Sequence, residues 1–335
     1  MDVTTGWLTI NRNCNNHCKW CYAQNVWNNT SIMDFEKAKR AVIELKKRGA
    51  RRIILIGGEP TIYPFFFDII RYIRENGLNV SVASNGRKFS NMEFARETVK
   101  AGITGIDISI KALTEEEYKE NTGNYGFKQM IEGYNNLVAL EFIPSVSYVI
   151  TTGDSKRLED LAKFVSENHM KKVSLQFVKP VIGAKEDSEE IMDIKVMGKF
   201  VETIYHVMEK YAIDYYLEIS FPLCLVKREI LDKLIYENRV INCCHVPSGT
   251  GVILDQDFKV LPCNHFAEFP FSKDSVDFDH EDSLEKIWES DIVKEFRRKA
   301  RCYPATKCQT CSMWNECGGG CFTRWLFLNP ADYIM

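Results

Sequence analysis

The sequence alternates six times between β-rich apolar runs and stretches with helical spacing, and this alternation restricts the possible folds more than any other feature. The β-rich runs read GWLTI, RRIILIGG, NVSVASNG, GIDISI, SVSYVIT and KVSLQFV. Between the first two runs, Ala38, Val42 and Leu45 recur at intervals of four and three residues, which places them on one face of a helix. Strict alternation of this kind is typical of parallel β/α architecture with right-handed crossovers.

Six such units are fewer than the eight that close a TIM barrel, so we expect an open, partial (β/α)6 TIM-like barrel of the α/β class over residues 1–215. From about residue 216 the alternation stops, and cysteine, glycine and proline concentrate toward the end of the chain. We expect residues 216–335 to form a bridging helical segment and a small cysteine-rich C-terminal domain. Active sites of parallel β/α folds lie at the carboxyl ends of the strands, and the segment after the first strand is rich in cysteine.

Two helix starts carry a sequence signature. Ser31 with Asp34, and Thr114 with Glu117, have the spacing of a capping box. In this motif a hydroxyl and an acidic side chain three residues later satisfy exposed backbone N–H groups. We therefore expect helices to begin directly after Ser31 and Thr114.

Composition excludes several classes of protein. With 335 residues, 45% of them hydrophobic, and a net charge of -3, the chain is typical of a globular protein with no electrostatic footprint for nucleic acid. No apolar run approaches the roughly 18 residues that span a bilayer, and the first residues lack the pattern of a signal peptide. The sequence therefore predicts a cytoplasmic protein, in which the 12 cysteines indicate metal binding rather than disulfides.

Three of the cysteines, Cys14, Cys18 and Cys21, are crowded into the segment NRNCNNHCKWCYAQN after the first β-rich run. A structural zinc site takes four ligands. Three thiolates on a cubane [4Fe-4S] cluster instead leave one iron open for an exchangeable ligand. Two alternatives stand beside this interpretation: a zinc site completed by His17, and a chance group of cysteines without a metal.

The spacing Cys14-x3-Cys18-x2-Cys21, with Trp20 before the third cysteine, resembles the radical S-adenosylmethionine (SAM) superfamily. This resemblance implies a [4Fe-4S] cluster whose open iron binds the amino and carboxylate groups of SAM, with Trp20 beside the cofactor. It also implies that an electron from the cluster cleaves SAM to a 5'-deoxyadenosyl radical, which abstracts a hydrogen atom from the substrate.

Three later segments are similar to motifs of the same superfamily, in the same order. The first, GGEP, comprises Gly57, Gly58, Glu59 and Pro60 after the second β-rich run. The resemblance implies that its backbone and Glu59 hold the SAM amino group. Glycine permits the backbone to approach a ligand closely, although a plain strand-ending turn would read the same.

The other two segments end the third and fourth β-rich runs. Ser84 and Asn85, within ASNG, either bond the SAM ribose or make a turn. Ser109 is a candidate for binding the SAM carboxylate, and Lys111 either pairs with that carboxylate or is solvated. The superfamily often has Ser-x-Asp-Gly at this point where the chain reads SIKA, so the roles of Ser109 and Lys111 stay open.

A second group of cysteines closes the chain, at Cys308, Cys311, Cys317 and Cys321. Their spacing resembles the SPASM extension of radical SAM enzymes, which holds two auxiliary [4Fe-4S] clusters; a zinc ribbon with paired knuckles is the alternative. By this resemblance the outer cluster takes Cys308, Cys311 and Cys317. By the same resemblance, the ligands of the inner cluster are Cys244 or Cys243, Cys263 and Cys321.

The chain departs from the SPASM pattern at its end. The last cysteine of the pattern is missing, because no cysteine follows Cys321. Cys302 and Asp332 are the candidates for that position, and the alternative is a ligand that is not part of the protein. Cys224, which stands alone in FPLCLV, is expected to be a buried core thiol rather than a metal ligand.

The residues after Cys263 bear on the substrate. Anaerobic sulfatase maturases, which this chain resembles, have an aspartate base where Asn264 stands here, and an amide cannot act as a general base. Histidine side chains ordinarily titrate near neutral pH, so His265 is a candidate catalytic base. The alternative is a histidine that is merely packed beside a cluster.

The resemblance implies a radical SAM/SPASM enzyme that crosslinks or oxidises side chains of a ribosomally made precursor peptide, as peptide (RiPP) maturases do. Alternatives are a dehydrogenase or epimerase of a small molecule such as a sugar or aminocyclitol, an anaerobic sulfatase maturase, and a zinc-binding interaction module without catalysis. Few residues precede the first β-rich run, so we expect either a separate leader-binding protein or a small substrate. An electron donor such as flavodoxin or ferredoxin is expected as a partner.

Overall fold

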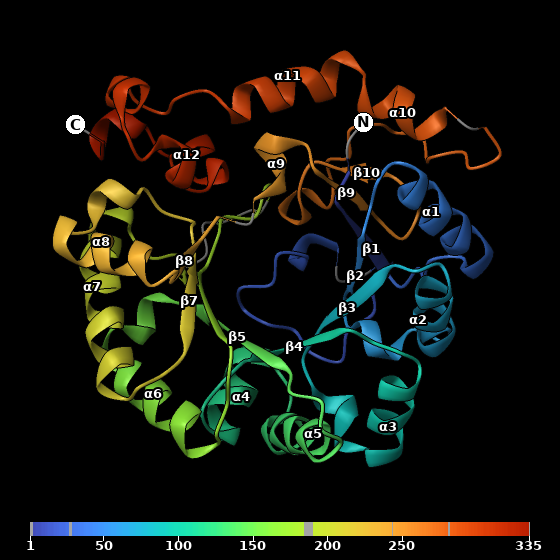
Figure 1. The fold of residues 1–335 in the computed structure, drawn as a ribbon, viewed down its shortest axis with the longest axis horizontal. Coiled ribbons are helices and arrows are strands. Elements are labelled where there is room, and N and C mark those ends of the chain that lie inside the picture. Colours follow the sequence, from blue (N-terminus) through green and yellow to red (C-terminus); the bar gives the residue numbers. More distant parts are fainter. Residues whose placement is uncertain (1–2, 27–28, 184–189, 243, 281, 335) are drawn as a thin grey trace. The chain divides into compact units, whose positions relative to one another are not determined.

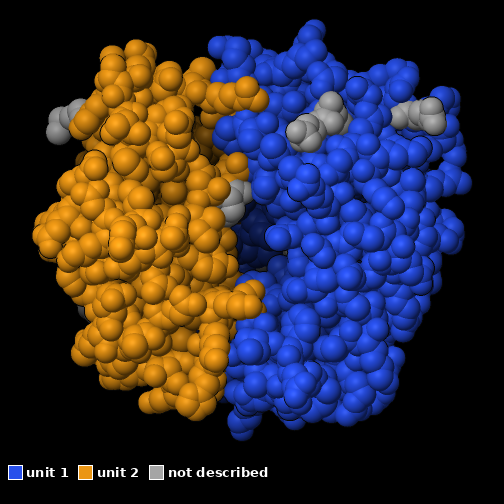
Figure 2. Space-filling view, viewed as in Figure 1, with its two compact units in different colours: residues 1–144, 245–299 blue, residues 145–244, 300–335 orange. Residues whose placement is uncertain are grey.

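The computed structural model describes residues 3–26, 29–183, 190–242, 244–280 and 282–334. The chain divides into two compact units, each made of two separate stretches (Figure 2). Unit 1 comprises Met1–Pro144 and His245–Lys299, and unit 2 comprises Ser145–Cys244 and Ala300–Met335. Helices and strands are labelled in Figure 1.

Unit 1 contains a mostly parallel sheet with the strand order β10-β9-β1-β2-β3-β4. Neighbouring strands run parallel from β9 to β4, and β10 pairs antiparallel with β9. The strands are β1 (Thr5–Asn11), β2 (Arg52–Gly57), β3 (Asn79–Ser84), β4 (Gly105–Ile110), β9 (Gly251–Leu254) and β10 (Val260–Leu261). The β9-β10 hairpin therefore brings a segment from late in the sequence beside β1.

Helices connect these strands and cover the sheet (Figure 1). They are α1 (Phe35–Lys47), α2 (Phe66–Glu75), α3 (Met92–Lys100), α4 (Glu115–Thr122), α5 (Phe127–Ala139), α9 (His245–Ser248), α10 (Ser283–Trp288) and α11 (Asp291–Ala300). Ala38, Val42 and Leu45 are buried on α1, which confirms the predicted apolar face. A Cβ at Gly6 would lie 2.6 Å from Leu45 Cδ1, so glycine in β1 lets this helix pack closely on the sheet.

Unit 2 contains four parallel strands in the order β5-β6-β7-β8. They are β5 (Ser145–Ile150), β6 (Val173–Phe177), β7 (Tyr215–Glu218) and β8 (Val240–Ile241). The α-helices are α6 (Leu158–Glu167), α7 (Ile194–Lys210), α8 (Arg228–Tyr236) and α12 (Trp314–Cys317). The chain end forms the short 3-10 turns η7 (Thr306–Thr310), η8 (Phe322–Leu326) and η9 (Pro330–Asp332). No helix in the described part of the chain has the length and apolarity to cross a membrane.

Gly198 fixes where α7 meets the turn η5 (Leu223–Leu225) within unit 2. A Cβ at Gly198 would lie 1.9 Å from the carbonyl oxygen of Leu225. Any larger residue would push the helix and the turn apart, so glycine is required by this close approach. The turn is thereby held against a helix that buries an apolar face along its whole length.

All six predicted β-rich runs are strands, β1 to β6, which confirms this part of the prediction. The parallel strands β7 and β8 continue the alternation past residue 215 and were not predicted, because four and two residues are too short to show a clear period. The division into two compact units does not test the predicted boundary between residues 1–215 and 216–335, which stays a prediction.

One of the two predicted helix starts is wrong. The cap of α1 is Asp34, whose side chain accepts a hydrogen bond from a backbone N–H of the first turn. The Ser31 hydroxyl instead donates to Asn29 Oδ1 at 2.5 Å, because the chain turns there before the helix begins. Thr114 does cap α4, and its hydroxyl accepts from the Glu117 backbone N–H at 3.2 Å.

Candidate functional site

Three segments that follow neighbouring parallel strands meet at one edge of unit 1. β1 leads into the first cysteine loop (residues 12–23), β2 leads into the GGEP motif, and β3 ends at Ser84. Because these three strands are adjacent and parallel, their carboxyl ends lie at the same edge of the sheet. The predicted motifs are therefore brought together at the edge where active sites of such folds lie.

The GGEP motif packs directly against the first cysteine loop. The backbone N–H of Gly58 donates to the carbonyl oxygen of Asn11 at 3.0 Å, and that of Glu59 donates to the carbonyl oxygen of Asn13 at 2.7 Å. A Cβ at Gly58 would lie 2.1 Å from the Asn13 oxygen, and one at Gly57 would lie 2.3 Å from the Asn11 oxygen. The close approach that requires both glycines is therefore to the loop itself, while the contact with SAM stays a prediction.

The Glu59 carboxylate is 2% exposed and joins the ends of β2 and β3. Its Oε1 accepts hydrogen bonds from the backbone N–H and the hydroxyl of Thr61, at 3.1 and 2.7 Å, and from the Ser84 hydroxyl at 2.7 Å. Its Oε2 accepts from the backbone N–H of Asn85 at 2.8 Å. These donors offset the cost of removing the carboxylate from water. The buried Pro60 opens the turn η2 (Pro60–Ile62) directly after it.

Polar side chains at the end of β3 reach back to the first cysteine loop. Asn85 Nδ2 donates to Asn15 Oδ1 at 2.6 Å. Arg87 Nη1 donates to the carbonyl oxygen of Asn15 at 2.7 Å and to Asn16 Oδ1 at 2.9 Å, and Asn16 Nδ2 donates to the Tyr118 hydroxyl at 2.8 Å. Asn85 therefore helps to fix the first cysteine loop. Its predicted hydrogen bond to the SAM ribose stays a prediction. Arg87 was missed, although its position directly after ASNG was a usable signal.

Burial sets the charge state of the loop thiols in the metal-free chain. It raises the pKa of Cys14 from 9.0 to about 12, with the negative charge of Glu59 as the second cause. Burial also raises the pKa of Cys18, while the positive charge of Lys111 opposes that shift. Both thiols are therefore protonated at neutral pH without a metal, and metal binding has to displace their protons.

Lys111 follows β4 and Ser109 lies within it, and both side chains are partly buried. The structure brings Lys111 into electrostatic range of Cys18, so this lysine faces the first cysteine loop. Binding of the SAM carboxylate by either residue stays a prediction.

Tyr22 links the first cysteine loop with the segment around Cys263. Its hydroxyl donates to the carbonyl oxygen of Gly57 at 3.2 Å, and its ring lies 5.8 Å from the His265 ring, tilted by 47°. Burial raises the pKa of Tyr22, with smaller contributions from the charges of Cys21 and Cys263. His265 and Cys263 therefore lie close to the loop within unit 1, and Tyr22 is a site residue that the sequence did not predict.

Two buried polar atoms beside cysteines have no hydrogen-bond partner in the part of the chain that the structure describes. They are Nε1 of Trp20, which precedes Cys21, and Oδ1 of Asn264, which follows Cys263. A buried donor or acceptor without a partner costs free energy, so a further polar group is expected to bind them. A [4Fe-4S] cluster with SAM fits this need, because the two groups together carry both acceptors and donors.

Within the described residues, no three His, Cys, Asp or Glu side chains are arranged to hold a metal ion. A mononuclear zinc site needs such convergence, since all its ligands bind one ion. The thiolates of a [4Fe-4S] cluster are spread further apart because each binds a different iron. His17, the fourth ligand of the zinc alternative, is exposed. Three thiols with an exposed histidine are a donor set that fits a cluster with one open iron, and the choice between cluster and zinc stays a prediction.

The C-terminal cysteines lie on short turns of unit 2, here called the cysteine knuckle (residues 305–321). Cys308 is buried in η7, Cys311 ends that turn, and Cys317 ends α12. The three glycines between Cys317 and Cys321 have φ values of 54°, 76° and 80°, a left-handed conformation that residues with a side chain rarely adopt. The sequence CGGGC therefore forms a turn that other residues would strain.

Arg324 is a buried cation beside the knuckle, only 2% exposed. Its Nε donates to the carbonyl oxygen of Ser220 at 3.1 Å, and its Nη2 donates to that of Val178 at 2.5 Å. Burial lowers the pKa of Arg324 to about 10, and the charge of Cys321 opposes the shift. No carboxylate of the described residues pairs with it. Because an uncompensated buried charge is costly, an anionic group near Cys321 would stabilise unit 2.

The remaining cysteines differ in exposure. Cys224, Cys244 and Cys302 are exposed, while Cys263 and Cys321 are partly buried. The expectation that Cys224 is a buried core thiol is therefore wrong, because η5 carries it at the surface. Cys243 lies outside the described residues. The predicted inner ligand set takes residues from both compact units and stays a prediction.

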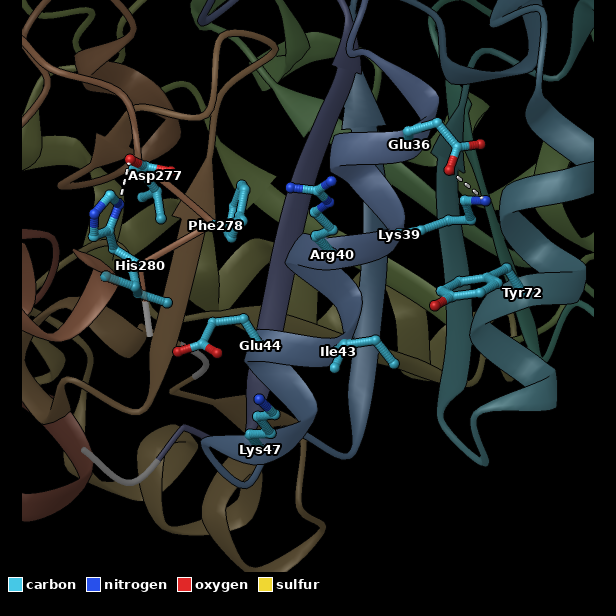
Figure 3. A pocket seen from close by; sticks show the side chains of 12 residues that line it. Glu36, Lys39, Arg40, Ile43, Glu44, Lys47, Tyr72, Asp277, Phe278 and His280 are labelled. Atoms are coloured by element: carbon cyan, nitrogen blue, oxygen red, sulfur yellow. Dashed lines mark hydrogen bonds and ion pairs between the residues drawn. The ribbon is translucent and has the colours of Figure 1, made fainter. Parts of the chain in front are cut away.

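Unit 1 also has a pocket of about 320 Å³ between the outer face of α1 and residues 276–284 (Figure 3). Its lining includes the ion pairs of Lys39 with Glu36, at 2.7 Å, and of His280 with Asp277, at 2.7 Å. None of the lining residues belongs to the cysteine groups or to the predicted SAM motifs. We therefore assign this pocket no part in the chemistry.

Comparison with known proteins identifies the class. Residues 8–167 match the family described as Radical SAM superfamily, so the chain carries a radical SAM domain. The matched stretch contains the first cysteine loop, the GGEP motif and the ASNG motif. A radical SAM domain implies a [4Fe-4S] cluster and SAM as cofactors.

Solved structures show the fold. Streptococcus suis SuiB bound to S-adenosylmethionine has a TM-score of 0.75 at 17% identity, over 97% of this chain and 74% of that chain. The anSMEcpe protein with bound AdoMet has a TM-score of 0.74 at 16% identity, over 96% and 86%. The chain therefore has the predicted α/β fold of a partial TIM-like barrel with a cysteine-rich C-terminus.

Two curated relatives differ in how much of the chain they match. The tungsten-containing aldehyde ferredoxin oxidoreductase cofactor-modifying protein of Pyrococcus furiosus is 23% identical over 93% of this chain and 88% of its own length. A probable GTP 3',8-cyclase of Pyrococcus abyssi is 28% identical over 49% of this chain and 54% of its own length. The chain thus spans about half the length of that second relative.

Proposed function

We propose that this radical SAM protein abstracts a hydrogen atom from a ribosomally made precursor peptide, which leads to crosslinking or oxidation of the peptide's side chains. One observation carries the proposal. The fold is similar to that of SuiB bound to the precursor peptide SuiA over 97% of this chain, with a TM-score of 0.73 at 16% identity. A likeness over almost the whole chain includes the C-terminal segment as well as the radical SAM domain.

In this proposal the first cysteine loop holds the reactive cofactor. Cys14, Cys18 and Cys21 bind a [4Fe-4S] cluster, which together with SAM supplies a 5'-deoxyadenosyl radical. The role of the protein in this step is to hold the loop in place through hydrogen bonds from Glu59, Asn85 and Arg87. His265 is the proposed proton acceptor near the site. His265→Ala should leave SAM cleavage without substrate intact and lower the yield of modified product; an unchanged yield would mean that the ring is only packed there.

We further propose auxiliary [4Fe-4S] clusters at the C-terminal cysteines. The spacing of Cys308, Cys311 and Cys317 supports an outer cluster. The buried charge of Arg324 beside Cys321 supports a negatively charged group in the same unit. Auxiliary clusters suit reactions in which a substrate radical has to lose an electron.

A second candidate substrate is a small molecule or a cofactor. The relative that matches the chain nearly end to end is described as a cofactor-modifying protein, and another as a probable GTP 3',8-cyclase. Both names favour a substrate smaller than a protein. We rank this candidate second, because the GTP cyclase match covers only 49% of this chain.

The deciding experiment uses anaerobically purified, iron-loaded protein, reduced with dithionite and supplied with SAM. 5'-Deoxyadenosine is measured alone, with short peptides encoded beside the gene, and with GTP. We expect a peptide to raise 5'-deoxyadenosine formation and to lose hydrogen, as seen by mass spectrometry. Turnover of GTP with every peptide inert would overturn the peptide proposal, and no 5'-deoxyadenosine under any condition would overturn radical chemistry as well.

Partners and location complete the proposal. A flavodoxin or ferredoxin would supply the electron in place of dithionite, and a separate protein would bind the leader of the precursor peptide. We propose a cytoplasmic location, where thiols stay reduced. A pull-down with the chain as bait in a lysate of its own source, with and without the peptide, tests both partners.

A further inference from the structure

The proposed outer cluster is short of one ligand. A [4Fe-4S] cluster held entirely by protein takes four cysteine thiolates, and the knuckle supplies Cys308, Cys311 and Cys317. No cysteine follows Cys321 in the sequence. A thiol that lies near these three in the fold is therefore a candidate for the fourth ligand.

The segment that contains Cys224 lies directly on the knuckle. The backbone N–H of Leu223 donates to the sulfur of Cys317 at 3.3 Å, across 94 positions of sequence. A Cβ at Gly320 would lie 2.7 Å from the carbonyl carbon of Phe221, so the two backbones are in close contact there. Cys224 follows Leu223 in the same turn, η5, so its backbone lies close to the knuckle.

The Cys224 thiol lies within electrostatic range of knuckle thiols. Burial raises the pKa of Cys224, and the charges of Cys317 and Cys308 raise it further, while the charge of Lys307 lowers it. Two of the three proposed outer ligands therefore lie within electrostatic range of Cys224. Four cysteines, from two distant stretches of sequence, are thus gathered in one region of unit 2.

The supports of η5 hold this thiol in place without a metal. Gly198 lets α7 approach the carbonyl oxygen of Leu225, the last residue of the turn, closely. Arg324 Nε donates to the carbonyl oxygen of Ser220, three residues before the turn begins. The backbone is therefore held before and after Cys224, which is itself exposed.

We propose that Cys224 is the fourth protein ligand of the outer auxiliary cluster, together with the three knuckle cysteines. This inference rests on the proposed auxiliary clusters and replaces Cys302 and Asp332 as the candidates for that position. The step is an acid–base exchange without redox change: an iron–sulfur bond forms, and the thiol proton leaves to solvent. Asp332 is a hard oxygen ligand on the exposed turn η9, less suited to iron–sulfur chemistry than a thiolate.

The first test is thiol footprinting of the full wild-type chain, before and after anaerobic loading with ferrous iron and sulfide. A brief pulse of iodoacetamide is followed by peptide mass spectrometry. We expect Cys224 to be alkylated in the apo-protein and protected at least about tenfold after loading, in step with the partly buried Cys311 and Cys317. Cys302 should be alkylated in both states.

Three outcomes would overturn the inference, and each has a different meaning. Alkylation of Cys224 after loading, with Cys308 and Cys317 protected, would leave the outer cluster standing without this ligand. Protection of Cys302 instead of Cys224 would assign the position to Cys302. Alkylation of all knuckle cysteines after loading would remove the outer cluster itself, while formation of 5'-deoxyadenosine by the same sample would leave the radical SAM assignment intact.

A second test separates ligation from simple shielding. Cys224→Ala and its matched control Cys302→Ala are made in a chain whose three first-loop cysteines are replaced by alanine, so that only auxiliary iron remains. On mild oxidation, Cys224→Ala should lose about one iron per chain more than its parent and give the EPR signal of a three-iron cluster. Cys302→Ala should match the parent. Equal iron and equal EPR spectra in both variants would overturn the proposal.

Discussion

The first cysteine loop and the cysteine knuckle both present cysteine thiols, but different structural elements hold those thiols in place. The loop follows a buried strand and is fixed by hydrogen bonds from Glu59, Asn85 and Arg87. The knuckle consists of short turns and left-handed glycines, with few buried side chains of its own. The protein therefore positions the loop thiols before any metal arrives, and we expect the knuckle to depend more on the proposed auxiliary cluster for its order.

The largest expected effect comes from removing the thiols of the first loop. Replacing Cys14, Cys18 and Cys21 together by alanine should reduce 5'-deoxyadenosine formation to the background of the assay, because no cluster remains to bind SAM. Iron bound at the C-terminal cysteines should persist in the same variant. Retained SAM cleavage would contradict the assignment of the catalytic cluster to the first loop. Loss of all iron would contradict the expectation that the two groups of cysteines bind iron independently.

Removal of metal should separate the two regions more directly. Chelation of iron from the loaded protein is expected to speed amide hydrogen exchange in residues 305–321 by about tenfold or more, since the turns lose their cross-link. Strand β2 should keep its protection and serve as the internal control. Hydrogen exchange with mass spectrometry measures both, and equal loss of protection in the two regions would refute the comparison.

Glu59→Gln tests the support of the loop without touching a thiol. An amide can accept at only one of its two positions, so at least one buried donor of Thr61, Ser84 or Asn85 loses its partner. We expect the free energy of unfolding of the apo-protein to fall by about 2 kcal/mol, measured by urea denaturation. The exposed Glu75→Gln is the matched control and should change it by less than about 0.5 kcal/mol.

The last expected effect is a dependence on alkaline pH, which is confined to pH values above 9. The folded chain raises the pKa of Cys14 from 9.0 to about 12, so the protonated thiol is favoured by folding. Its contribution to stability is complete below pH 9 and is lost as the pH rises toward 12. The unfolding free energy of the apo-protein should therefore fall more steeply above pH 9 in the wild type than in Cys14→Ala. If the unfolding free energy fell equally steeply with pH in both proteins, the raised pKa of Cys14 would be contradicted.

The parts of the fold that the sequence predicted are those with strong local signals. The six β-rich runs became β1 to β6, because short runs rich in β-branched and aromatic residues, alternating or continuous in apolar character, favour a strand. The cap at Thr114 was predicted correctly, but Ser31 was not distinguished from Asp34, since both have side chains that can cap a helix. The strands β7 and β8 were too short to be found.

The candidate site was predicted as residue types and not as contacts. Spacing identified the thiols of the first loop and the GGEP motif, but not that Gly58 packs on Asn13 or that Tyr22 meets His265. These contacts join residues that are far apart in sequence, and their pairing depends on the register of neighbouring strands. Cys224 was predicted to be buried for the same reason: nothing in FPLCLV indicates which surface it faces.

By itself, the sequence determined the chemistry of this protein: three thiols at fixed spacing, a second thiol group near the end, and alternating strands to carry the first. Only the tertiary structure decided which side chains hold those thiols. Ser84 reaches Glu59 across 25 positions, and Leu223 reaches Cys317 across 94. The physical reason is that ligand identity is a local property of the chain, whereas a hydrogen bond between distant residues forms only after the intervening chain has been ordered at a cost in entropy.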